Sequence, residues 1–321
     1  MPIRQRELAN GLVLNLSGKD QSLDEGDHEL LRRGRVLRVD PSNSCNAACV
    51  FCESSFSSRG ARLPLAVFEE ALATLGQSPF LDTLQFGCTY EPTIRKDFSE
   101  FGRILERTRL GRAPDTISIV SNCWLLDRHD LEPFVNGGLN KLHVSLHSHE
   151  AQEFEAVMGH DYLSRVTENL KAFKSRFPHV VVSAVCVVNT LNVGAPLDFA
   201  RWAFSEVGVD YLRFTRANIV GKSPASPAKA ALEQLPAGSS YEVSDEAWSV
   251  FVARARDVKR LGLELLESRQ NLKNSAITVD ALRLKRRGAP SESTAIRLAR
   301  ADRSTGSQAS RTARAGAVAT A

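Results

Sequence analysis

The chain has 321 residues and a formal net charge of +4, a length that allows one large α/β domain or two modest ones. It has no apolar run near the roughly 20 residues of a membrane span and no signal peptide, so we expect a cytoplasmic protein with no membrane partner. Six cysteines without paired spacing favour a reducing compartment.

The positive charge is concentrated at the C-terminal end. Residues 283–321 contain nine Lys or Arg and two Asp or Glu, a net charge of +7, so residues 1–282 carry −3. Few large apolar side chains follow residue 287, and we expect 287–321 to be a disordered basic tail. Such a tail could contact RNA, but a solvated extension is the better interpretation, and a nucleic-acid partner is not expected.

Six short apolar segments predict β-strands, and helical patterns separate them. The strands are expected at 35–40, 81–86, 116–121, 141–147, 179–188 and 210–215. Strands that alternate with helices need crossover connections and form a parallel sheet. Periodicity alone leaves open whether this α/β sheet is doubly wound or curls toward a barrel.

The same pattern divides the chain into four parts. We expect a polar lead-in at 1–34, a core domain at 35–216, a helical extension at 217–286 and the tail at 287–321. In the extension, Ser244 is expected to cap a helix that ends before Gly262.

Three cysteines follow the first predicted strand with C-x3-C-x2-C spacing: Cys45, Cys49 and Cys52. Three thiolates on one loop can hold three irons of a 4Fe-4S cube and leave the fourth iron without a protein ligand. A zinc knuckle is one alternative, but such a site usually has four ligands, and no second cysteine pair follows closely. Buried, chemically inert cysteines are the other alternative.

This loop resembles the cluster loop of the radical S-adenosylmethionine (radical SAM) superfamily. The resemblance implies a partial (β/α)6 TIM-like barrel with the cluster loop after its first strand. It also implies two cofactors, a 4Fe-4S cluster and S-adenosyl-L-methionine. In this family the cofactor's amino and carboxylate groups chelate the open iron, and reductive cleavage gives a 5'-deoxyadenosyl radical.

The resemblance extends to the segment after the second predicted strand. Glu91, followed by Pro92, stands where the family has an acid that accepts a hydrogen bond from the methionine ammonium. Cys88, Thr89 and Tyr90 precede it and are assigned to the same cofactor pocket. The sequence departs from the family's Gly-Gly-Glu-Pro pattern here, because Thr89 and Tyr90 replace the two glycines.

Further cofactor contacts follow from the same resemblance. Phe51 occupies the position of an apolar residue beside the adenine. Ser121 and Asn122 resemble the start of the family's Thr-Asn-Gly, with Cys123 in the glycine position. Ser145 matches a family position near the ribose. Two further assignments come from the residues themselves: Asn189 is a polar group at the end of the fifth predicted strand, and Arg213 in the sixth could bind a carboxylate or phosphate of the cofactor or substrate.

Two kinds of residue are candidates for further chemistry. His143 and His147 lie on one strand face about 13 Å apart, too far to share a metal ion, so proton transfer or substrate hydrogen bonding is the better functional interpretation. Cys186 is a candidate hydrogen-atom donor, although cysteines at such positions are more often buried and chemically inert.

Together these patterns predict a radical SAM enzyme with one 4Fe-4S cluster that abstracts a hydrogen atom from a small polar metabolite. Epimerisation, dehydrogenation and rearrangement all remain open. Such an enzyme needs an external electron donor such as flavodoxin or ferredoxin. Peptide modification is the alternative within the family. A non-catalytic iron-sulfur electron carrier or redox sensor, with Cys88 as a possible fourth ligand, is the alternative from another class.

Overall fold

A computed structural model describes most of the chain, including most of its central domain. The described residues are 3–8, 11–16, 22–52, 60–108, 110, 113–217, 241–268, 281–291 and 294–295.

The described chain forms one mixed sheet in the order β1-β2-β3-β4-β5-β6-β7-β8-β10-β9. Strands β2 to β8 are parallel, whereas β1, β10 and β9 each pair antiparallel with their neighbour. The strands are β1 (Ile3–Leu8), β2 (Gly11–Leu16), β3 (Val36–Val39), β4 (Thr83–Phe86), β5 (Thr116–Ser121), β6 (Lys141–Ser145), β7 (Val181–Val188), β8 (Tyr211–Arg216), β9 (Leu263–Ser268) and β10 (Ala281–Arg286). All six strands expected from the sequence are present as β3 to β8.

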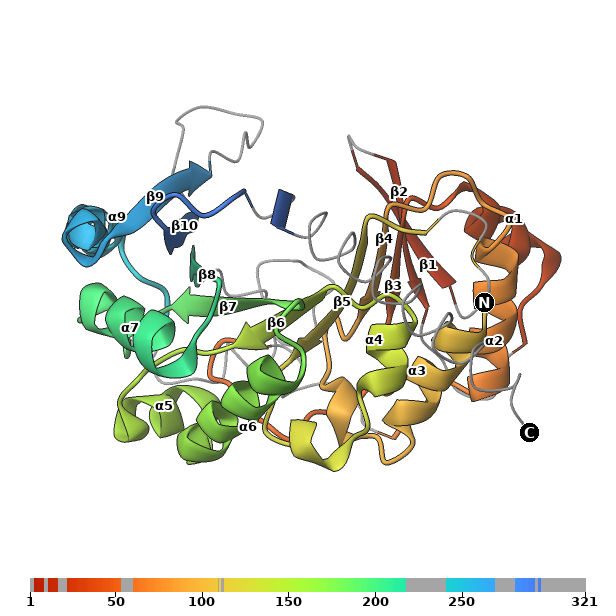
Figure 1. Cartoon of the computed structure of the whole chain (residues 1–321), viewed down its shortest axis with the longest axis horizontal. Coiled ribbons are helices and arrows are strands. Elements are labelled where there is room, and N and C mark those ends of the chain that lie inside the picture. The colour runs from red at the N-terminus through yellow and green to blue at the C-terminus, as the bar shows by residue number, and fades with distance from the viewer. Residues whose placement is uncertain are drawn as a thin grey trace, which may run out of the picture.

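Helices connect the parallel strands and cover one side of the curved sheet (Figure 1). The α-helices are α1 (Glu25–Arg33), α2 (Leu65–Leu75), α3 (Phe98–Arg107), α4 (Glu132–Asn136), α5 (Ala151–Met158), α6 (Leu163–Arg176), α7 (Pro196–Trp202) and α9 (Asp245–Ala255). Short turns of other helix types are η2 (Pro92–Ile94), η3 (Leu126–Arg128), η4 (Ala203–Val207) and η6 (Arg256–Leu261).

The two faces of the sheet follow from the alternation of side chains along each strand. In β4, Leu84 and Phe86 are fully buried, and Phe86 packs against Phe98 and Phe101 of α3 with ring centroids 6.4 Å away in each case. Gln85 lies between them in the strand and therefore faces the other way. We call the face that carries Gln85, opposite the helices, the inner face of the sheet.

Both ends of the sheet differ from the sequence prediction. The expected polar lead-in contains the β1–β2 hairpin, and Leu14 and Leu16 of β2 are fully buried. The extension at 217–286 is only partly helical: α9 begins as expected after Ser244, whose hydroxyl accepts a hydrogen bond from the Ala247 amide. Strands β9 and β10 then extend the sheet beyond β8.

The first residues of the predicted tail are also folded against the sheet. The Tyr211 hydroxyl donates a hydrogen bond to the Pro290 carbonyl at 2.7 Å, and Val181 and Tyr211 pack against Ala295. The expectation of disorder from residue 287 is therefore wrong for residues 287–291. Residues 296–321 lie outside the described part of the chain.

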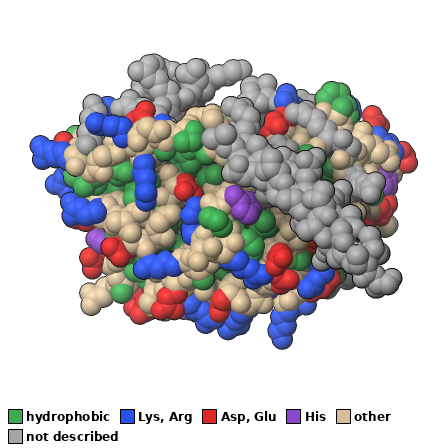
Figure 2. All heavy atoms as spheres, viewed as in Figure 1, with side chains coloured by type: hydrophobic (Ala, Val, Ile, Leu, Met, Phe, Trp, Pro, Cys, Tyr) green, Lys and Arg blue, Asp and Glu red, His purple; other side chains and the backbone are tan. Residues whose placement is uncertain are grey.

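None of the helices in the described ranges is long and apolar enough to cross a bilayer. Acidic and basic side chains are mixed along the helix-covered lower rim in Figure 2.

Candidate active site

The three-cysteine loop begins beyond the carboxyl end of β3 and is held by the end of α5. The Ala48 amide donates to the Met158 carbonyl at 3.0 Å, and the Val50 amide donates to the Val157 carbonyl at 3.1 Å. Gly159 ends α5 with φ of 80°, and a Cβ there would lie 2.8 Å from that of Ala48. A glycine at this point lets helix and loop approach closely.

The thiols of the loop influence one another electrostatically. Burial raises the pKa of Cys49, and the charges of Cys52 and Cys45 raise it further. The Cys49 thiol also contacts the Met158 sulfur at 3.5 Å. Three thiolates this close need a compensating cation, and coordination to a metal centre deprotonates a thiol outright.

Two buried polar groups beside the loop have no hydrogen-bond partner among the residues that the structure describes. They are Nδ2 of Asn46, next to Cys45 in the chain, and the hydroxyl of Tyr162. The Tyr162 ring stacks on Trp124 with centroids 4.3 Å apart, and the charges of Cys49 and Cys45 contribute to its raised pKa after the larger effect of burial. Buried donors normally find an acceptor, so these two groups fit a sulfur-rich cofactor between them and the thiols.

Within the described ranges, no group of three or more His, Cys, Asp or Glu side chains is placed to hold one metal ion. The residues fit an iron-sulfur cluster for two reasons. The charges of Cys45 and Cys52 raise the pKa of Cys49, and the donors of Asn46 and Tyr162 face this region without a partner among the described residues.

Glu91 lies directly behind the cysteine loop and is 3% exposed. One carboxylate oxygen accepts hydrogen bonds from the amide and hydroxyl of Thr93 at 3.0 and 2.6 Å and from the Ser121 hydroxyl at 2.8 Å. The other accepts from the Asn122 amide at 2.7 Å. Burial raises the pKa of Glu91, and these bonds act in the opposite direction.

Asn122 connects the end of β5 to the cysteine loop. Its side-chain amide donates to Oδ1 of Asn46 at 2.8 Å, and its own Oδ1 accepts from the Trp124 amide at 3.0 Å. Cys123 follows with φ of 59° and is the only non-glycine residue of the described chain with positive φ. This is the position at which the family motif noted above has glycine.

Asp40, which sequence reasoning missed, organises the loop after β4. Its side chain accepts hydrogen bonds from the amides of Cys88 at 2.8 Å and Thr89 at 3.3 Å. Burial raises its pKa, and these backbone bonds lower it. The available signal was an acidic residue at the end of a predicted apolar strand.

Thr89 and Tyr90 stand where the family pattern has two glycines. Thr89 is exposed and Tyr90 is half-buried, so neither side chain occupies the interior position of Glu91.

Cys88 belongs to this second loop rather than to the cysteine cluster. Burial and the charge of Asp40 raise its pKa to about 11, whereas Arg38 lowers it. Within the described chain, the charged groups that shift Cys88 do not include Cys45, Cys49 or Cys52. This arrangement does not favour Cys88 as a fourth cluster ligand.

The cysteine loop meets the inner face of the sheet through Phe51. Its ring packs edge-on against His147, with centroids 5.0 Å apart and planes inclined by 85°. His147 is 3% exposed, and burial lowers its pKa to about 3. The Val187 amide donates to Nδ1 of His147 at 3.0 Å, which fixes the ring. Ser145, two residues earlier, is the last residue of β6.

Asn189 is fully buried but is used within the turn after β7. Its Oδ1 accepts from the Leu191 amide at 2.9 Å, and its Nδ2 donates to the Val187 carbonyl at 3.2 Å. The structure therefore gives this residue a turn-forming role, and nothing in it directs the amide to a cofactor.

Cys186 is not placed for hydrogen-atom transfer. It lies between Ala184 and Val188 on the helix-facing side of β7, 3% exposed within the apolar core. Its thiol contacts the His147 carbonyl at 3.6 Å, and the charge of Glu153 in α5 contributes to its raised pKa after burial. This placement does not favour the expected hydrogen-donor role, because strand alternation turns the thiol away from the inner face.

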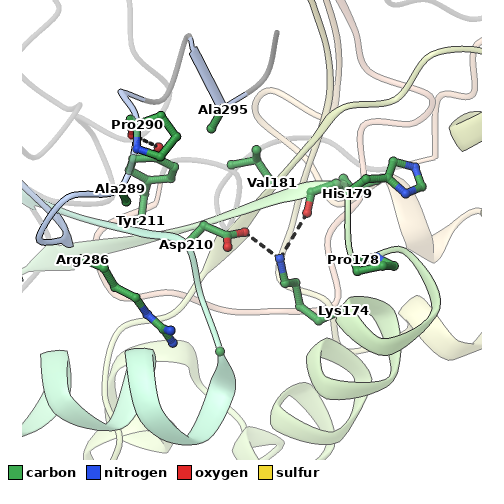
Figure 3. Close-up of a pocket in the computed structure, with 12 residues that line it drawn as sticks. Lys174, Pro178, His179, Val181, Asp210, Tyr211, Arg286, Ala289, Pro290 and Ala295 are labelled. Carbon is green, nitrogen blue, oxygen red and sulfur yellow. Dashed lines mark hydrogen bonds and ion pairs between the residues drawn. The ribbon is translucent and has the colours of Figure 1, made fainter. Parts of the chain in front are cut away.

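A separate cavity of about 490 Å³ lies at the opposite, amino-terminal ends of β7 and β8 (Figure 3). Lys174 lines it and forms an ion pair with Asp210 at 2.8 Å. Residues 289–290 and Ala295 close its other side. This cavity is at the wrong end of the strands to share the cysteine site.

The model of the Radical SAM superfamily matches residues 39–203, which is just over half of the chain. The matched region contains the cysteine loop, Glu91 and Asn122. The chain belongs to the radical SAM superfamily. A 4Fe-4S cluster and S-adenosylmethionine are the cofactors of this family.

Individual relatives each match about half of the chain. A GTP 3',8-cyclase of Yersinia pestis is 28% identical over 179 residues, 53% of this chain and 52% of the relative. One from Klebsiella pneumoniae is 31% identical over 159 residues, 48% of this chain and 47% of the relative. The chain thus spans about half the length of the curated relatives it matches.

Solved radical SAM structures share the fold at low sequence identity. The protein anSMEcpe with bound AdoMet gives a TM-score of 0.54 at 16% identity, covering 69% of this chain and 59% of that one. TYW1 with a lysine-pyruvate adduct gives 0.51 at 12% identity, covering 86% and 80%. These matches support the barrel-like fold expected from the cysteine motif.

Proposed function

We propose that this radical SAM protein is an enzyme that reductively cleaves S-adenosylmethionine at one 4Fe-4S cluster and takes a hydrogen atom from a small polar metabolite. The observation that carries the proposal is the convergence of the Cys45–Cys49–Cys52 loop, Glu91 and Asn122 at the carboxyl ends of β3, β4 and β5. In barrel-like α/β folds, catalytic groups lie at this end of the strands.

When bound, the cluster and S-adenosylmethionine supply an electron and a 5'-deoxyadenosyl radical that abstracts hydrogen. The three cysteines would hold the cluster. Glu91, a carboxylate fixed by its hydrogen bonds, would hold the ammonium group of the cofactor. Phe51 would flank the adenine, and Asn46 and Tyr162 would donate hydrogen bonds toward sulfur. The rigid sheet positions the reacting groups, which is the protein's main contribution to such a reaction.

A small-molecule substrate is favoured over a peptide for two reasons. The sequence-similar relatives are named for a reaction of GTP, a small molecule. The structural match to anSMEcpe, which has also been solved with peptides, is at 16% identity and supports the fold only. An electron donor such as flavodoxin or ferredoxin would supply the reducing electron.

The experiment that separates an enzyme from an electron carrier is electron paramagnetic resonance of the reduced protein. Adding S-adenosylmethionine should change the spectrum if the cofactor binds an open iron, and Glu91→Gln should weaken the change. Glu100→Gln, on the exposed side of α3, is the matched control. An unchanged spectrum in protein with a full cluster would support the carrier or sensor alternative.

A further inference from the structure

Two aromatic rings beside the cysteine loop stack face to face. The rings of Trp124 and Tyr162 have centroids 4.3 Å apart and planes inclined by only 3°. Trp124 is half-buried, whereas Tyr162 is buried. The imidazole of His160 is exposed and lies against the indole, with its centroid 5.6 Å from that of Trp124. These rings therefore form a continuous series from the surface to the interior.

The inner end of this series reaches the cysteine loop. The hydroxyl of Tyr162 has no hydrogen-bond partner within the described ranges. Burial raises its pKa, and the charges of Cys49 and Cys45 raise it further. The phenol is therefore protonated, touches Trp124 through its ring and lies within electrostatic range of the thiols.

Hydrogen bonds fix Trp124 relative to the same loop. Its amide donates to Oδ1 of Asn122 at 3.0 Å, and the side chain of Asn122 donates to Asn46 at 2.8 Å. The Trp124 carbonyl accepts from Nδ2 of Asn169 at 3.3 Å. The positive φ of Cys123, 59°, turns the chain immediately before the tryptophan. A ring anchored on both sides keeps a constant distance to the thiols, and a constant short distance favours electron transfer because its rate falls steeply with separation.

The proposed function needs an electron from outside the chain. Aromatic rings in contact couple an electron donor to an acceptor better than saturated side chains of the same length, because their electrons are delocalised. Tryptophan is also among the residues most enriched at the energetic centres of protein–protein interfaces. A half-buried tryptophan that stacks on a buried tyrosine beside the thiols has both properties.

We propose that a small redox protein, a flavodoxin or a ferredoxin, contacts the surface formed by Trp124 and His160, and that its electron enters the cluster through the stacked rings of Trp124 and Tyr162. One electron leaves the donor protein and one arrives at the cluster. No bond forms or breaks in the stack, and Tyr162 keeps its proton. The inference rests on the proposed function, because it gives the reducing partner of that function a place on the chain.

The test is the rate at which donor proteins reduce the cluster of the full chain. The chain is reconstituted with Mössbauer-active iron, so that freeze-quenched samples report this cluster alone, and is mixed with flavodoxin hydroquinone in one arm and reduced ferredoxin in the other. Dithionite, a small molecule that needs no docking surface, gives the reference rate. We expect at least one donor protein to reduce the cluster at a rate that saturates with its concentration. Failure of both, in protein that dithionite reduces, would overturn the proposal.

Variants of Trp124 locate the route. In Trp124→Leu, the ratio of the limiting rate with the donor protein to the rate with dithionite should fall at least tenfold. Trp202→Leu is the matched control, because Trp202 is also half-buried and packs against a histidine, His149, with centroids 6.4 Å apart. It should change the ratio less than twofold.

A second variant covers the case in which Trp124→Leu does not take up a cluster. Trp124→Phe keeps a smaller ring on Tyr162, and its ratio should still fall at least threefold. A wild-type ratio in either cluster-loaded variant of Trp124 would contradict the proposal.

Electron entry and cofactor cleavage are independent measurements. A wild-type ratio in cluster-loaded Trp124→Leu, in a protein whose wild type forms 5'-deoxyadenosine with dithionite, would refute this inference alone. A wild-type cluster that accepts electrons through Trp124 and never cleaves S-adenosylmethionine would refute the proposed function instead.

Discussion

Asn122 at the end of β5 donates a side-chain hydrogen bond to Asn46 in the cysteine loop at 2.8 Å. This bond joins two loops that are 76 residues apart in sequence. It is formed by a buried side chain that also accepts from the Trp124 amide. The pair fixes the loop that carries the cysteines to the end of β5, where Ser121 and Asn122 also bind Glu91.

Replacement of Asn122 by Ala should therefore loosen the loop. Removal of one partner leaves buried polar groups unsatisfied, which costs about 1–3 kcal/mol. We expect the free energy of unfolding in urea to fall by that amount. Asn136→Ala, which removes an exposed hydrogen bond to Glu106, should change it by less than about 0.5 kcal/mol. Equal effects of the two substitutions would show that the bond does not stabilise the site.

Glu91→Gln tests the role of the carboxylate. The acid accepts four hydrogen bonds on its two oxygens, whereas glutamine has one oxygen and an amide that must donate. At least one donor from Thr93, Ser121 or Asn122 then faces another donor, and we expect a loss of about 1–3 kcal/mol in stability. Affinity for S-adenosylmethionine, measured by equilibrium dialysis, should fall at least tenfold. A stable variant with unchanged affinity would remove Glu91 from the site.

The buried hydroxyl of Tyr162 should contribute little to the stability of the protein without its cluster. Because that hydroxyl has no partner, Tyr162→Phe should leave the free energy of unfolding unchanged or slightly increased. Tyr211→Phe is the matched control, since its hydroxyl donates to Pro290 and its loss should cost about 1 kcal/mol. In cluster-loaded protein, Tyr162→Phe should shift the reduction potential. An unshifted potential would show that the hydroxyl does not reach the cluster.

His147 should make stability depend on pH. Its pKa is lowered to about 3 by burial, against an ordinary value near 6.5, so the unfolded chain binds the proton first as pH falls. The stability contributed by the neutral ring is complete above about pH 6.5 and is lost at up to about 1.4 kcal/mol per pH unit below it. The difference in unfolding free energy between wild type and His147→Asn should shrink accordingly between pH 6.5 and 4.5. Parallel curves would place the pKa of His147 near its ordinary value.

The central fold was predictable because its signals are local. Each of the strands β3 to β8 is a short apolar run, and the cysteine spacing stands directly after the first of them. The outer strands β1, β2, β9 and β10 were harder to predict from the sequence. The sequence Asn10–Gly11, whose glycine is the first residue of β2, is a common hairpin signal. In β10, Leu282 and Leu284 alternate with Arg283 and Lys285, but the net charge of the region concealed this two-residue period.

Parts of the site could not be predicted because they depend on long-range packing. Only the folded chain shows that the end of α5 holds the cysteine loop and that Asp40 binds the amides of Cys88 and Thr89. The face of β7 on which Cys186 lies could not be predicted for a simpler reason. The strand around it is apolar on both faces, so the sequence did not indicate which face meets the helices.

The most direct measurement is 5'-deoxyadenosine formation under anaerobic conditions. Protein reconstituted with iron and sulfide is mixed with S-adenosylmethionine and dithionite, and products are separated by liquid chromatography and mass spectrometry. Wild-type protein should form 5'-deoxyadenosine, and Cys49→Ala should lose both the cluster and the product. Wild-type protein that carries a full 4Fe-4S cluster and still forms no 5'-deoxyadenosine would contradict the proposed function.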